Sequence, residues 1–136
     1  MQKKKMLITE VAVVLASSIN YTSVTLLNSI WRLELYVLIP MLFIVTFLMG
    51  LITIDTKKAL VYAISGIFFG TALATAVMVA PAILLGEGGS IVDSALNTAL
   101  NAVSKFLIFS VVVSIISALM GSVVGELVEP ITDFQA

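Results

Sequence analysis

Few side chains in this sequence could do chemistry, and Glu10 is the first of them along the chain. It lies in an otherwise apolar stretch that follows the basic arm Lys3–Lys5. A carboxylate in an apolar helix is costly unless it binds an ion, moves a proton or pairs with a cation. Because Glu10 lies about one to two helical turns beyond the arm, we favour pairing with a lysine over an ion or proton site.

A second set of polar side chains recurs at helical spacing after Glu10. Ser18, Thr22, Thr25 and Ser29 follow one another at steps of four, three and four residues. This spacing predicts a polar stripe along one face of a helix. The β-branched content of Tyr21–Thr25 also allows an extended stretch, but we favour the helix. The stripe and Glu10 are the features that suggest a transporter. The later apolar segments lack the ionisable residues that a pathway at the membrane midplane needs, so we rank transport last.

The residue types behind most catalytic and metal sites are missing. The sequence has no Cys and no His, which removes thiolate chemistry and the commonest metal ligand and general base. It contains no Gly-rich phosphate loop, nucleophile elbow or metal-spaced carboxylate cluster. We therefore expect no enzymatic activity, no cofactor and no bound metal.

Two further features are candidate sites of interaction or modification. Lys3, Lys4 and Lys5 could contact phosphate groups of nucleic acid or of lipid, or could serve membrane topology alone. Asn20 begins an Asn-Tyr-Thr sequon that we expect on the outer side, which makes Asn20 a candidate for N-glycosylation. The sequence leaves these alternatives open.

The composition limits the class of protein. Of the 136 residues, 60% are hydrophobic and 11% are charged, against about 45–50% and 25% in soluble domains. A single core in a domain of this size could not hide so much apolar surface. Most of that surface must therefore face lipid or further copies of the chain. The net charge of −1 gives no global indication of nucleic-acid binding.

Four apolar segments of helical length account for nearly the whole chain. We expect helices at about 6–31, 35–54, 59–86 and 90–127. Short polar breaks separate them, and Asp55 or Thr56 could cap the third helix. The sequence thus predicts a single domain, residues 1–136, that is all-α and resembles a membrane protein. It would form a four-helix bundle of two α-hairpins, about 6–54 and 59–127.

The last segment is too long to be only a membrane span. From Ser90 to Leu127 it would extend about 55 Å, well over the ~30 Å of a bilayer core. Polar residues at steps of four from Asp93 to Lys105 mark one face of its first part, and no charge occurs between Phe106 and Gly125. Ser90 and Asp93 have the spacing of a capping box, which predicts that Ser90 caps the helix.

Small residues recur at helical steps in the last two segments. Rows of this kind let two helix backbones approach closely. We expect the two rows to form a seam between the third and fourth helices. The helix-packing candidates are Gly66, Gly70 and Ala74 in the third segment and Ser117, Gly121 and Gly125 in the fourth.

The lysines predict a topology. Lys3–Lys5 and Lys57–Lys58, five of the seven basic residues, belong to one end of the expected bundle, whereas Arg32 and Lys105 belong to the other. Basic residues are enriched on the cytoplasmic side of membrane proteins. Both termini are therefore expected inside.

The order of the segments resembles that of the coat proteins of spindle-shaped archaeal viruses. It consists of a short basic start, an apolar helix, a Ser/Thr/Asn-rich turn and a second apolar helix, followed by a second such hairpin. The resemblance covers residues 6–127 and includes no residue-level motif. It implies α-helical hairpins, self-assembly into arrays that enclose DNA, and no enzymatic activity. It assigns no functional residue.

Two interpretations of the function follow. In the one we favour, the chain is a self-assembling structural coat protein that forms a hydrophobic helical shell around viral DNA. Its partners would be copies of itself, DNA in the lumen and lipid, and it would reach the virion after a stage in the host membrane. In the alternative, the chain is a four-pass integral protein of the cell membrane and an accessory subunit of a membrane complex.

Overall fold

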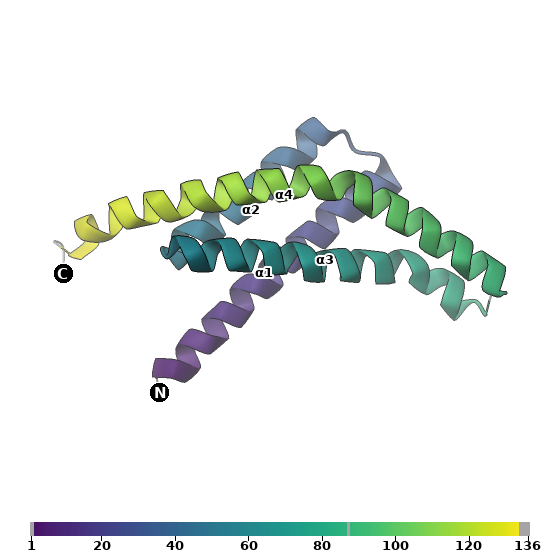
Figure 1. The fold of residues 1–136 in the computed structure, drawn as a ribbon, viewed down its shortest axis with the longest axis horizontal. Helices are drawn as coiled ribbons and strands as arrows, with labels where there is room; N and C mark the ends of the chain where they lie inside the picture. Colours follow the sequence, from purple (N-terminus) through teal and green to yellow (C-terminus); the bar gives the residue numbers. More distant parts are fainter. Residues whose placement is uncertain (1, 87, 134–136) are drawn as a thin grey trace.

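The computed structural model describes residues 2–86 and 88–133, and nearly all of them are helical. The predicted all-α class with four long apolar helices is confirmed, and each helix is long and apolar enough to cross a membrane. The helices are α1 (Gln2–Trp31), α2 (Leu35–Thr53), α3 (Thr56–Leu84) and α4 (Gly89–Asp133) (Figure 1).

The reversal between α2 and α3 is very short and is stabilised by a capping residue. The Asp55 carboxylate accepts hydrogen bonds from the backbone N–H groups of Lys57 and Lys58, at 2.9 and 3.3 Å. Of the two residues predicted as possible caps of the third helix, Asp55 is the N-cap, and Thr56 is the first residue of α3. Directly before it, Ile54 adopts a positive φ of 61°, which is strained for a β-branched residue. The chain accepts this strain to reverse direction within two residues.

The last helix begins slightly earlier than the sequence predicts. The Gly88 carbonyl accepts a hydrogen bond from the Val92 N–H at 3.3 Å, and α4 starts at Gly89. Ser90 therefore lies inside the first turn, and the prediction that it caps the helix is wrong. The helix is also longer than the expected length of about 55 Å: α4 has 45 residues and extends about 68 Å at 1.5 Å per residue. The prediction that it exceeds a bilayer core of about 30 Å is confirmed.

The two hairpins form two layers, with α1 and α2 behind α3 and α4 in the view of Figure 1. Across the layers, α1 packs mainly on α3 and α2 packs mainly on α4. The α1–α3 pair is parallel. Near the beginning of both helices, Glu10 contacts Lys58, and further along Thr22 forms a hydrogen bond with Gly70. In each case the two residues are 48 positions apart in the sequence. The two helices therefore keep one register over this distance.

Two buried clusters hold the layers together. The first draws side chains from all four helices, and the rings of Tyr21 and Phe106 lie 6.0 Å apart within it. The second consists mostly of alanines. Outside these clusters, large apolar side chains are exposed on every helix. The first cluster comprises Tyr21, Val24, Leu38, Leu42, Ile67 and Phe106, and the second Met49, Ala59, Ala63 and Ala118.

We expect Tyr21→Phe to stabilise the protein. Tyr21 is 1% exposed, and within the described residues its hydroxyl has no hydrogen-bond partner. An unpaired buried hydroxyl costs folding free energy, so its removal should raise the free energy of unfolding by about 1 kcal/mol. Denaturant titration in detergent measures the change. Tyr36→Phe removes an exposed hydroxyl and should leave stability unchanged. A loss of stability in Tyr21→Phe would show that the hydroxyl is satisfied.

Candidate functional site

The polar stripe of α1 is directed into the protein, towards α3. Ser18, Thr22 and Thr25 are all buried. The Thr22 hydroxyl lies 2.8 Å from the Ser18 carbonyl of its own helix and 3.1 Å from the Gly70 carbonyl of α3. Ser18 and Thr25 each donate to the carbonyl four residues earlier, at 2.8 Å. The stripe that suggested a transport path is therefore a helix-packing surface.

The small-residue row of α3 packs against this stripe. A Cβ atom on Gly66 would overlap the Ser17 side chain, and one on Gly70 would lie 2.9 Å from the Ser18 carbonyl oxygen. Ala74, the next residue of the row, is fully buried. The backbones of α1 and α3 therefore approach more closely than a methyl group allows, and glycine is the residue that permits this.

The small-residue row of α4 packs against α2. A Cβ atom on Gly121 would overlap the Phe47 carbonyl oxygen, and one on Gly125 would lie 2.8 Å from the Leu51 carbonyl oxygen. Ser117, one turn before Gly121, is fully buried. Here the atoms that exclude a side chain belong to the opposing backbone, so this contact leaves less room for adjustment than the one at Gly66.

The prediction that the two small-residue rows pack against each other is therefore wrong. The glycines of α3 face α1 and those of α4 face α2, so each row meets a helix of the other hairpin. The physical reason is that α1 and α2 offer small surfaces of their own. Sequence reasoning missed Ser17, which packs against Gly66, and Gly50 of α2. A Cβ atom added to Gly50 would overlap the Ala118 carbonyl oxygen of α4. The four-residue step from Thr46 to Gly50 was the available signal in α2.

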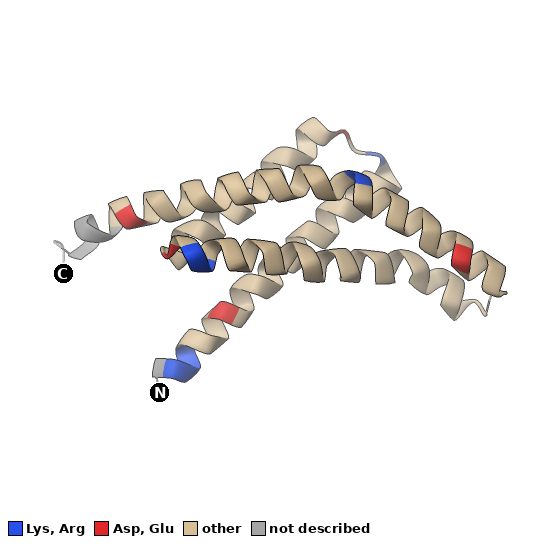
Figure 2. Ribbon diagram, in the orientation of Figure 1, with Lys and Arg blue, Asp and Glu red and all other residues tan. Residues whose placement is uncertain are grey.

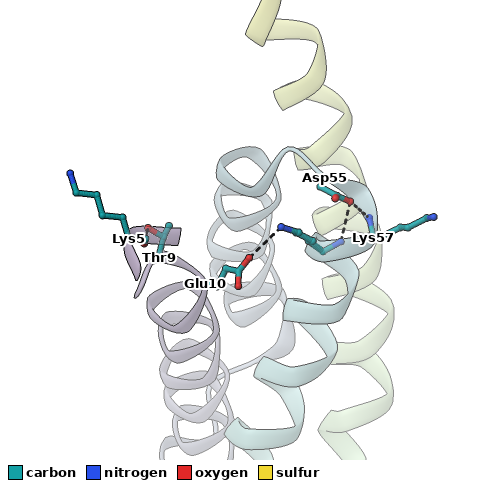
Figure 3. Close-up of polar contacts among 6 residues, drawn as sticks. Lys5, Thr9, Glu10, Asp55 and Lys57 are labelled. Carbon is teal, nitrogen blue, oxygen red and sulfur yellow. Dashed lines mark hydrogen bonds and ion pairs between the residues drawn. The ribbon is translucent and has the colours of Figure 1, made fainter. Parts of the chain in front are cut away.

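Glu10 forms the predicted pair with a lysine, and that lysine is Lys58 of α3 (dashed line from Glu10 in Figure 3). The Lys58 Nζ and the Glu10 Oε1 are 3.3 Å apart, and both side chains are partly exposed. Tyr62, one turn further along α3, lines the same depression. A partly exposed pair of this kind contributes about 0–1 kcal/mol. The ion pair therefore follows from the α1–α3 register and does not determine it.

The basic residues of the first and third helices share one end of the bundle. Lys3–Lys5 belong to the first turns of α1, and Lys57–Lys58 to the first turn of α3 (Figure 2). All five side chains are exposed. Arg32 lies in the connection at the far end of α1, beside Trp31, which is 74% exposed. The charge separation that underlies the predicted topology is thus present in the fold.

The Asn20 sequon lies within α1 and not in an outer connection. Its Thr22 is buried against α3, where the hydroxyl contacts the Gly70 carbonyl. Glycosylation acceptors belong to exposed surface loops. The position of the sequon inside a helix, with its threonine buried, argues against Asn20 as an acceptor in the folded chain.

Among the residues whose side chains the structure describes, 3–86 and 88–128, no three Asp, Glu, His or Cys side chains are grouped so that they could hold a metal ion. The chain matches no protein-family model, no curated protein and no solved structure in the comparisons made. The features that remain as a basis for function are the helix-packing surfaces, the exposed apolar faces and the charged end.

We expect Gly66→Ala to destabilise the protein by about 1–3 kcal/mol, the usual cost of overpacking. Ser17→Gly removes the overlapping atoms and should restore much of the loss. Gly121→Ala should be similarly destabilising, but with no side-chain rescue, because the opposing atom is the Phe47 carbonyl oxygen. Thermal unfolding in detergent measures all three effects. Gly89→Ala, which has open space around its Cβ, is the control. Failure of Ser17→Gly to improve Gly66→Ala would contradict the α1–α3 contact.

Proposed function

We propose that the chain is a structural subunit that assembles with copies of itself through exposed apolar helix faces, and that the assembly is a coat around viral DNA. The observation that supports self-assembly is the length of α4 over which apolar side chains are exposed. This stretch runs from Ile91 to Val128, about 55 Å along the helix. A bilayer core of about 30 Å would cover roughly half of it.

One exposed stripe on α4 is suited to packing against another helix. Its members follow one another at steps of three and four residues, so they share one helix face. Their exposed fractions lie between 49% and 66%, and a continuous apolar patch of this kind marks an interaction surface. The stripe consists of Phe109, Val112, Ile116, Met120, Val123 and Leu127.

The viral part of the proposal comes from the resemblance in segment order, which implies a shell around DNA. The charged end is compatible with it, because Lys3–Lys5 and Lys57–Lys58 are exposed and could meet phosphate groups. Such a protein needs no catalytic residue. Its function would consist of assembly and enclosure.

The second candidate is a four-pass integral protein of the cell membrane that acts as an accessory subunit. The observation that favours it is the charge distribution. Five lysines share one end, and all four helices are long and apolar enough to span a bilayer. In this case lipid and partner subunits would cover the exposed apolar faces.

We expect the native material to sediment as large regular particles without detergent and to protect DNA from added nuclease. Self-association through apolar faces makes detergent unnecessary, and enclosure makes the DNA inaccessible. Electron micrographs and gel analysis after nuclease treatment are the measurements. Extraction only with detergent, as monomers or together with other chains, would contradict the coat and favour the membrane subunit.

We also expect the α4 stripe to be an interface between copies. Because the chain has no cysteine, Ile116→Cys supplies a single thiol on the stripe. In detergent-free assemblies a bis-maleimide should join these thiols into covalent dimers. Ser117→Cys, a near-isosteric change at a fully buried position, should stay monomeric. Monomers alone from Ile116→Cys would show that the stripe does not face another copy.

A further inference from the structure

An open groove lies between α1 and α3, and its lining begins at Leu7, close to the charged end. Its volume is about 550 Å³, and its walls are almost entirely apolar. On α1 it follows the residues from Leu7 to Ile19, which is about 18 Å of helix. On α3 it is bounded by Tyr62, Phe69 and Leu73. The polar residues of its lining are Glu10, Ser18 and Tyr62, and Glu10 is the charged one among them.

The dimensions of the groove distinguish between its possible occupants. The groove volume is the space open to the centres of water-sized molecules. Spread over about 18 Å, it corresponds to a free width of roughly 9 Å between the walls. An α-helix with its side chains is about 10–12 Å wide. A helix from a second copy would therefore lie over the mouth of the groove, whereas one hydrocarbon chain fits along its floor.

The charges at the polar end favour a negatively charged headgroup. Glu10 is neutralised by Lys58 in the 3.3 Å ion pair, and the Asp55 carboxylate is engaged by backbone N–H groups at the start of α3. Lys3 lies four residues before Leu7, the first residue of the groove, and therefore on the same face of α1. Its exposed ammonium group extends the groove with a positive charge.

We propose that the groove binds one acyl chain of an anionic phospholipid, with the headgroup phosphate at Lys3. The apolar channel accepts the chain, and the cationic end attracts the phosphate. The proposal holds for a coat that retains lipid and for a membrane subunit alike, so it does not depend on which function is correct.

The test compares phosphatidylglycerol with phosphatidylcholine of the same acyl chains, added to the protein in detergent. Native mass spectrometry should show one phosphatidylglycerol retained per chain, and the unfolding temperature should rise more than with phosphatidylcholine. Val11→Phe partly fills the groove and should reduce retention about tenfold. Ile44→Phe, an equally exposed change on α2 outside the groove, should retain the lipid. Lys3→Gln should remove the preference for phosphatidylglycerol, whereas Arg32→Gln at the opposite end should keep it.

Other outcomes would overturn the proposal. Equal retention of both lipids would exclude recognition of the anionic headgroup, and full retention by Val11→Phe would place the lipid elsewhere. The same rise in unfolding temperature with inorganic phosphate alone would indicate an ion site without an acyl chain. Loss of self-association in Val11→Phe, without lipid retention by the unmodified protein, would assign the groove to a second copy.

Discussion

The close approach of helix backbones in two parallel pairs is the constraint on which the rest of the structure depends. Burial of apolar side chains gives these helices little reason to associate, because lipid or neighbouring subunits would cover the same surface equally well. Dispersion and weak Cα–H contacts at short range supply the attraction instead. They require the absence of side chains at Gly66, Gly70 and Gly121. This close approach determines the register of α1 on α3. The register in turn places the Glu10–Lys58 ion pair and the groove between the two helices.

The two parallel pairs achieve this approach with different chemistry, and the difference determines which surfaces remain free. The α1–α3 pair places hydroxyl groups at its contact, and Thr22 reaches the Gly70 carbonyl. The α2–α4 pair uses glycines on both helices, at Gly50 and Gly121. At both contacts, small or polar residues face the neighbouring helix, while many large apolar residues are exposed on the outer faces. Large apolar side chains also fill the first buried cluster. The outer faces are therefore suited to lipid or to further subunits.

How much could be predicted from the sequence depended on the range of each interaction. The four helices and the Asp55 cap were predictable, because apolar length and capping are decided within a few residues. The helices that pack against the glycine rows were not predictable. A row of small residues indicates that another helix backbone comes close, but it does not indicate which helix this is. The Ser90 cap failed because Gly88 opens the helix first. The Asn20 sequon was misplaced because a Ser/Thr/Asn-rich sequence was assigned to a connection, although in this bundle it continues α1 and turns its hydroxyl groups towards α3.

The separation of 48 residues between Thr22 and Gly70 has a consequence for how the protein is made. At the usual 5–20 residues per second, a ribosome completes Gly70 about 2–10 s after Thr22. During that interval the hydroxyl-bearing face of α1 has no helix to cover it. The first helix to be synthesised therefore waits for the third before this face is covered. Any factor that shields nascent apolar segments would need to hold α1 until the second hairpin arrives.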